Sequence, residues 1–243
     1  MRPFPALQMD SAVGAPSQLP PAPIEIRLPE QPFTAANPIP GKPFLAGIWY
    51  VTHSSLPLWK DKRNVKIIYT PMLNSEVSCP AEECQCIGDV VTYQEWSTFS
   101  NQWKDKTISG IDRWQGDWET GNGKMLWRGK GWLKIATSEW QILSHGIEAG
   151  SGRSWMVTYF AKTLFTPIGL DVLCNHEEGL PRDTVDEIMS ALMRVEDPVI
   201  KKLAGQIFKV GKVSASPAVR MGYTDNSRLQ TDLNLELDEK QDG

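Results

Sequence analysis

The fold of this chain is decided by a β-branched and aromatic run that begins at residue 47, Gly47-Ile48-Trp49-Tyr50-Val51-Thr52-His53. Such residues favour a strand, and seven later segments share their composition or show the two-residue alternation of a strand. These segments are 64–70, 89–97, 107–114, 124–137, 139–145, 154–162 and 169–175. Consecutive antiparallel strands of this number favour a closed up-and-down barrel, because closure leaves no exposed edge. The sequence therefore predicts a mainly β fold, an eight-stranded antiparallel barrel.

The hydrophobic period changes after the last strand, and the new period predicts two helices. The first has apolar residues at helical spacing: Val185, Ile188, Met189, Leu192 and Met193. Thr184 and Glu187 have the spacing of a capping box at its start. Asp197-Pro198 begins the second helix and Gly211 ends it. Its apolar stripe is Ile200, Leu203, Ala204, Ile207 and Phe208. We expect both helices to pack on the outside of the barrel or across one end.

Proline and tryptophan divide the chain into three regions. Of the 18 prolines, 11 lie within residues 1–43, whereas all 10 tryptophans lie between Trp49 and Trp155. Proline cannot donate a backbone hydrogen bond, so residues 1–43 are expected to form an extended leader that crosses the surface at 24–26. Residues 44–210 are expected to form the barrel with its helices, and the polar residues 211–243 a disordered tail.

Charge and hydropathy exclude several classes of partner. The chain has 25 basic and 29 acidic residues and no block of Lys or Arg, so we expect no nucleic-acid partner. No apolar run approaches about 18 residues, which argues against stable membrane insertion. The N-terminal residues lack the apolar region of a signal peptide, and we expect a cytoplasmic protein. The oligomeric state is left open, and a homodimer is among the states that remain.

The sequence contains none of the motifs that hold common cofactors or activate common nucleophiles. A Gly-x-Ser-x-Gly elbow, a His-Glu-x-x-His helix, a phosphate loop and a dinucleotide fingerprint are all absent, so we expect no cofactor and no metal. Three of the four cysteines cluster at Cys79, Cys84 and Cys86, and the fourth is Cys174. Cys-x-Cys spacing is not typical of zinc sites, and the choice between free thiols and a loop disulfide stays open.

An eight-stranded barrel can hold one small ligand, and its interior residues alternate along each strand. If Trp49 points inward, Val51 and His53 do so too. The candidate catalytic residues can each donate a hydrogen bond to a bound molecule: His53, Tyr69 and Tyr159. The candidate substrate-binding residues are aromatic or apolar: Trp49, Val51, Trp96, Trp114, Trp127 and Trp155. Such a lining suits a large apolar or planar molecule, and hydrophobic small molecules are the expected partners.

Gly47-Ile48-Trp49, followed by seven more strands and a helix, resembles the lipocalin and calycin family. In that family the glycine permits a tight backbone approach, and the tryptophan packs across the closed end of the barrel. The segments 140–146, 154–159 and 163–171 look like the last strands of lipocalin-like proteins of fungal secondary metabolism. Within that group they are most similar to hetero-Diels–Alderases of tropolone–sesquiterpenoid pathways. The resemblance implies a pericyclase that joins an o-quinone methide to an apolar terpene.

Two other functions fit the same barrel. A carrier would shield an apolar metabolite without converting it, and an acid–base isomerase or cyclase would use His53 or a buried tyrosine as the proton donor. A pericyclase needs mainly proximity, which can remove roughly 7–11 kcal/mol of a barrier. Turnover separates the carrier from a catalyst, and the pH dependence of the rate separates acid–base catalysis from purely positional catalysis.

Overall fold

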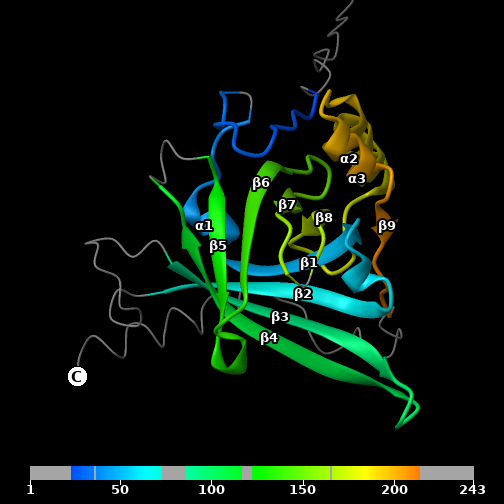
Figure 1. Ribbon diagram of the computed structural model, residues 1–243. Coiled ribbons are helices and arrows are strands. Elements are labelled where there is room, and N and C mark those ends of the chain that lie inside the picture. Colours follow the sequence, from blue (N-terminus) through cyan, green and yellow to red (C-terminus); the bar gives the residue numbers. More distant parts are fainter. Residues whose placement is uncertain (1–22, 36, 73–85, 117–121, 165, 214–243) are drawn as a thin grey trace, which may run out of the picture.

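The computed structural model describes residues 23–35, 37–72, 86–116, 122–164 and 166–213. Eight antiparallel strands follow one another around a closed barrel, and β1 closes it by pairing with both β2 and β8 (Figure 1). The strands are β1 (Gly47–Ser54), β2 (Lys62–Pro71), β3 (Cys86–Ser97), β4 (Gln102–Trp114), β5 (Lys124–Gly129), β6 (Thr137–Ile147), β7 (Ser154–Phe160) and β8 (Gly169–Cys174). The predicted eight-stranded antiparallel barrel is confirmed.

The prediction of one strand over residues 124–137 is wrong. β5 ends at Gly129, the 3-10 turn η3 (Gly131–Leu133) follows, and β6 begins at Thr137. Gly131 has a φ of 63°, and a Cβ atom on Gly129 would overlap Leu133. The two glycines therefore let the chain reverse direction between two strands, because no side chain blocks the turn.

The register of the strands defines the inner face of the barrel. Trp49 lies opposite Ile67, and Ile67 lies opposite Val91, so the three side chains share this face. The indole N–H of Trp49 donates a hydrogen bond of 2.9 Å to the carbonyl of Leu45 in α1 (Lys42–Leu45). Both residues are buried in the interior core, so the bond holds the short helix against one end of the barrel. Other members of this core are Val65, Met125, Trp140, Ile142, Met156 and Leu173.

Two helices cover the outer face of β6, β7 and β8 (Figure 1). They are α2 (Arg182–Arg194) and α3 (Pro198–Ala204). A second core joins the strands to the helices, and it contains Leu143, Val157, Leu170, Val172, Ile188, Leu192, Ile200 and Leu203. The predicted position of the helices outside the barrel is therefore confirmed.

The predicted start is correct for α3 and wrong for α2. The Asp197 carboxylate accepts hydrogen bonds of 2.8 Å from the backbone N–H groups of Val199 and Ile200, so Asp197 caps α3 as predicted. α2 begins directly after Pro181, which places Thr184 inside the helix rather than at its cap. Proline supplies no side-chain acceptor, so α2 begins without a side-chain capping bond.

The predicted end of the second helix is also wrong. α3 ends at Ala204, and Phe208 belongs to the short strand β9 (Phe208–Lys209). β9 pairs with His53 and Ser54 at the end of β1, where β1 and β2 are no longer paired. The residues predicted to form the last turn of the helix therefore pair with the part of β1 that does not pair with β2.

The described part of the leader lies along the outside of β6. This strand has a bulge between Ile142 and Ser144, which frees backbone groups from the ladder with β7. Arg27 Nε donates to the carbonyl of Ile142 at 2.7 Å, and Asn37 Nδ2 donates to the carbonyl of Leu143 at 2.8 Å. Ile24, Ile26 and Leu28 pack against the outer core. The leader thus satisfies the backbone groups that the bulge frees.

Parts of the predicted organisation lie outside the described residues. These parts are most of the leader, the tail beyond residue 213, Cys79 and Cys84. Cys86 and Cys174 are buried free thiols. Within the described ranges, no helix is long and apolar enough to cross a membrane.

Candidate functional site

A bulge in β1 determines which of its side chains enter the barrel. Val51 lies opposite Leu173, but the register then shifts by one residue, and Ser54 lies opposite Asp171. Both of these pairs face the interior. His53 therefore faces outward, and the prediction of an inward His53 is wrong, because the extra residue of the bulge reverses the alternation.

Three aspartates face the barrel interior, and none of them was among the predicted site residues. They are Asp89 on β3, Asp112 on β4 and Asp171 on β8, with exposed fractions of 5%, 0% and 1%. The sequence contains a signal for Asp112 alone, since it alternates with Gly110 and Trp114 on what becomes a buried face. Buried carboxyl groups are costly, so three of them in one interior indicate a functional site.

Asp89 and Asp112 form a hydrogen-bonded carboxyl pair. Burial raises the pKa of Asp112 to about 7, and burial together with the charge of Asp112 raises the pKa of Asp89 well above its usual range. Trp140 Nε1 donates to Asp112 Oδ1 at 2.7 Å. Among the described residues, no N–H or O–H group donates to Asp89 Oδ1 or to Asp112 Oδ2. A hydrogen bond between two carboxyls requires a proton. We place it on Asp89, because Asp112 acts to raise the pKa of Asp89, whereas the hydrogen bond with Asp89 acts to lower the pKa of Asp112.

Asp171 is the third interior carboxyl, and it has its own hydrogen-bond partners. Ser54 Oγ donates to Asp171 Oδ1 at 2.5 Å, and Trp59 Nε1 donates to Asp171 Oδ2 at 3.4 Å. Burial raises the pKa of Asp171 to about 7, although both hydrogen bonds act to lower it. Asp171 therefore changes its charge near neutral pH.

Aromatic side chains surround the carboxyl pair. Tyr69 and Trp140 stack with ring centroids 5.8 Å apart, and Trp140 stacks on Phe160 at 6.3 Å. Tyr69 lies opposite Asp89 on the inner face. Burial, and then the charges of the three aspartates, raise the pKa of Tyr69 well above its usual value. The Tyr69 phenol is therefore neutral and can donate a hydrogen bond inside the barrel.

Four side chains on three different strands pack against the interior core and remain only partly buried. They are Val91, Tyr93, Trp127 and Phe160. Trp127 lies directly opposite Asp112, so one of these partly buried side chains adjoins the carboxyl pair.

The structure brings five of the predicted site residues to the interior core. Four of them are buried, and Trp127 is partly buried and packs against this core. These five are Trp49, Val51, Tyr69, Trp114 and Trp127. Their roles in binding or catalysis stay predictions.

The other aromatic residues predicted to line the barrel lie elsewhere. Trp155 and Tyr159 belong to the outer core under the helices, because the inward positions of β7 are taken by Met156 and Thr158. Trp96 is 45% exposed, far along the β3–β4 hairpin, with its ring 5.7 Å from Trp103. The interior position expected for these three residues is therefore corrected by the strand register.

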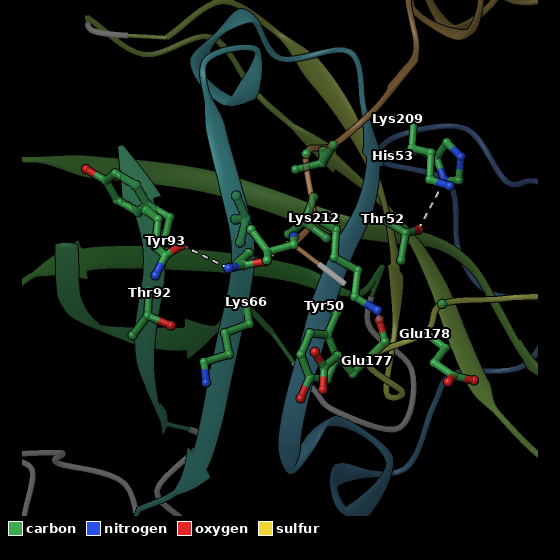
Figure 2. A pocket seen from close by; sticks show the side chains of 18 of the residues that line it. Tyr50, Thr52, His53, Lys66, Thr92, Tyr93, Glu177, Glu178, Lys209 and Lys212 are labelled. Carbon is green, nitrogen blue, oxygen red and sulfur yellow. Dashed lines mark hydrogen bonds between the residues drawn. The ribbon is translucent and has the colours of Figure 1, made fainter. Parts of the chain in front are cut away.

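His53 lies instead in a groove on the outside of the barrel, with a volume of about 850 Å³ (Figure 2). β1, β2, β3, the segment after β8 and the residues around β9 form its walls. The His53 ring lies 3.1 Å from Thr52 Oγ1, measured from Nδ1. Burial and the charge of Lys209 lower the pKa of His53. A neutral imidazole is therefore its resting form at physiological pH.

The charged side chains of this groove do not converge on one point. Lys66 and Lys212 point in different directions (Figure 2), and Lys212 Nζ donates to the backbone carbonyl of Glu177 at 2.7 Å. Glu178 lies on the same groove and pairs with Arg153 at 3.2 Å. Charges of both signs line the groove, so they do not produce a strong electrostatic potential of one sign that would attract an ionic ligand. The interior carboxyl pair is the better candidate for a functional site.

The fold and this interior define the class of the protein. It is a closed eight-stranded up-and-down β-barrel, the architecture of lipocalins, with a buried carboxyl pair among aromatic side chains. Among the described residues, no group of three or more His, Cys, Asp or Glu could hold a metal ion.

Comparison with known proteins assigns no family, since no family model and no curated protein matches the chain. Solved structures with a similar chain path include apocrustacyanin C1, with 11% identity over 74% of this chain and 84% of that chain and a TM-score of 0.44. The tryptamine complex of the amine binding protein of Rhodnius prolixus is 16% identical, and the match covers 81% of this chain and 91% of that chain with a TM-score of 0.43. The siderocalin Ex-FABP is 11% identical, and the match covers 71% of this chain and 97% of that chain with a TM-score of 0.41. Similarity at this level carries no argument about ligand or activity.

Proposed function

We propose that this protein binds two small, largely apolar molecules in the barrel and promotes a cycloaddition between them without a cofactor. The observation that carries the proposal is the Asp89–Asp112 carboxyl pair, buried beside Tyr69 and Trp140 in an apolar interior. A buried carboxyl pair destabilises a fold, so its presence is best explained by a chemical use. The neutral Tyr69 phenol supplies a second donor next to it.

The reaction that the sequence resemblance implies is a hetero-Diels–Alder cycloaddition of an o-quinone methide with an alkene. One C–C bond and one C–O bond form, three π bonds become one, and no atom, proton or electron is lost. Negative charge accumulates on the quinone methide oxygen while the C–C bond forms ahead of the C–O bond. A hydrogen bond to that oxygen is stronger in the transition state than in the ground state, which is the condition for catalysis.

The carboxyl pair can supply this hydrogen bond when both of its members are protonated. One proton is engaged between Asp89 and Asp112, so a second proton is required for a substrate oxygen. The pKa of Asp112 is raised to about 7, which means that the second proton is present below pH 7 and lost above it. Holding the two substrates together in the barrel lowers the barrier further by proximity.

The test measures turnover by the purified full-length chain, with an o-quinone methide generated in solution and a sesquiterpene alkene as substrates. We expect the adduct to form faster than in the protein-free control and mainly as one enantiomer. Asp112→Leu is expected to lower the rate by roughly 100-fold, since leucine has no group that can donate a hydrogen bond to the substrate oxygen. Asp105→Leu is the matched control, because Asp105 lies on the same strand but is exposed.

Each outcome separates the proposal from its alternatives. A rate and an enantiomer ratio equal to those of the protein-free control reject catalysis, and binding of one alkene per chain without turnover then identifies a carrier. An enantioselective reaction that Asp112→Leu leaves unchanged identifies a purely positional pericyclase and rejects the role of the carboxyl pair.

A further inference from the structure

The four connections at one end of the barrel each carry an exposed apolar side chain. In an up-and-down barrel the links from β1 to β2, β3 to β4, β5 to β6 and β7 to β8 all lie at the same end. We call this end, formed by residues 55–62, 95–106, 130–136 and 161–164, the loop end. Its apolar side chains, one on each link, are exposed by 43%, 100%, 88% and 96%: Leu58, Phe99, Ile135 and Leu164. Single exposed apolar side chains are ordinary, but one on every link at the same end forms an apolar rim.

The hairpin of β3 and β4 projects from the loop end beyond the other strands (Figure 1). The neighbouring strands β2 and β5 pair only with residues outside 96–103, so this part has no neighbour in the sheet. Phe99 lies in the turn at its tip. Trp96 and Trp103 lie opposite each other behind the turn, with ring centroids 5.7 Å apart. An apolar tip followed by tryptophans matches the order of a bilayer, whose acyl chains take apolar groups and whose headgroup region takes indoles.

Lysine dominates the charge of the loop end. Its residues include seven lysines and three acidic residues, although the whole chain has 25 basic and 29 acidic residues. Glu95 pairs with Lys62 at 3.0 Å and with Lys106 at 3.1 Å. Six of the seven lysines are exposed: Lys60, Lys104, Lys106, Lys130, Lys134 and Lys162. The loop end therefore presents positive charge around its apolar rim, which complements an anionic surface.

We propose that the loop end docks on the surface of a membrane that contains anionic phospholipids. Phe99 and the rest of the apolar rim enter the boundary of the acyl chains, the two tryptophans of the hairpin lie among the headgroups, and the lysines attract the anionic lipids. A second copy of the chain is a poorer partner, because two loop ends would bring two positive surfaces together. The docking needs no segment that spans the bilayer, and it does not rest on the proposed function.

The test is cosedimentation of the purified full-length chain with vesicles of phosphatidylcholine, either alone or with about 30% phosphatidylserine. We expect binding to the anionic vesicles to be at least roughly tenfold stronger, and to weaken when salt is raised from about 0.1 M to about 1 M, because salt screens the lysine charges. Phe99→Ser should lower the affinity roughly tenfold by removing the most exposed apolar side chain. Ile147→Ser is its control, because Ile147 is 67% exposed but lies at the opposite end of the barrel, where β6 ends.

A second pair of variants tests the charge. The double variant Lys130→Gln, Lys134→Gln should lower the affinity for anionic vesicles by roughly fivefold for each lysine. The double variant Lys201→Gln, Lys202→Gln removes two exposed charges from α3, away from the loop end, and should leave the affinity within about twofold of the wild type. All four substituted lysines are exposed, so we expect the variants to fold.

Each outcome decides for or against the membrane. Absence of binding to the anionic vesicles overturns the proposal, and so does binding that Phe99→Ser leaves unchanged or that is equally strong on neutral vesicles. A dimer in sedimentation velocity that Phe99→Ser dissociates, without binding to vesicles, identifies a second copy as the partner. Binding that is selective for anionic vesicles, and that both loop-end variants weaken while both controls keep, supports the proposal. The cycloaddition is measured without vesicles, so its failure leaves this result unaffected.

Discussion

Replacement of Asp171 by Asn is expected to change how the stability of the fold depends on pH. Asp171 is fully buried, and burial raises the pKa of its carboxyl from 3.8 to about 7. A carboxyl with a higher pKa in the folded than in the unfolded state stabilises the folded state while it holds its proton. This contribution is fully present below pH 3.8 and is lost as the pH rises through about 7. The asparagine variant has no such proton to lose.

The size of the effect follows from the two pKa values. Each unit of difference corresponds to about 1.36 kcal/mol. For a change from 3.8 to about 7, the loss of stability between pH 5 and pH 8 integrates to roughly 2.5 kcal/mol for this carboxyl. Domains are stable by about 5–15 kcal/mol in total, so a loss of this size is readily measured.

The assay is urea unfolding, followed by tryptophan fluorescence at several values between pH 5 and pH 8. The free energy of unfolding of the wild type should fall by about 2.5 kcal/mol more than that of Asp171→Asn over this range. Subtracting the unfolding free energy of Asp171→Asn from that of the wild type cancels the contributions of other groups. Among these groups are His53 and His145, whose lowered pKa values make the fold more stable as the pH rises.

The control for this assay is Asp186→Asn, which makes the same chemical change on the exposed face of α2. Its unfolding free energy should follow that of the wild type at each pH. Parallel pH curves for the wild type and Asp171→Asn would refute the reasoning, because they would mean that burial does not raise the pKa of this carboxyl.

The other predictions concern the proposed reaction, the interior and a helix cap. The cycloaddition rate should fall tenfold per pH unit well above pH 7, as Asp112 loses its proton, and a pH–rate profile measures this. Gly110→Ala should lower the unfolding free energy by about 1–3 kcal/mol, since a Cβ there overlaps the Trp127 indole. Asp197→Ala should lower it by about 0.5–2 kcal/mol through loss of the α3 cap. Urea unfolding measures both.

Each of these predictions has a result that contradicts it. A rate that stays constant from pH 6 to pH 9 excludes Asp112 as the proton donor. Gly205→Ala is the control for Gly110→Ala, because its Cβ would meet other atoms only at ordinary contact distances of 3.6 Å or more. Equal stability of these two variants contradicts the predicted overlap. Full stability of Asp197→Ala contradicts the assigned cap.

The strands and their closure could be predicted from the sequence because they depend on local patterns. Each of the eight strands overlaps a predicted segment, and the 3.6-residue period of α2 correctly marked the change from strands to helices. The helix ends were harder to predict. α3 stops at Ala204 because the following residues pair with β1, a partner about 150 residues away in the chain, and local propensity contains no information on that pairing.

The buried carboxyl groups of the interior could not be selected from the sequence for a similar reason. Asp89, Asp112 and Asp171 each look like a polar residue within a strand, and only the register of the closed sheet turns all three inward. Their raised pKa values come from burial and from one another, which are properties of the assembled barrel.

The sequence by itself determined the architecture, because alternation, turn residues and helical period are local and recur along the chain. Only the tertiary structure decided which side chains face the interior. One extra residue in β1 turned His53 outward and placed Ser54 beside Asp171, and the register of β7 put Thr158 inside and Tyr159 outside. The physical reason is that strand side chains repeat every two residues, so a shift of one residue exchanges the two faces of the sheet.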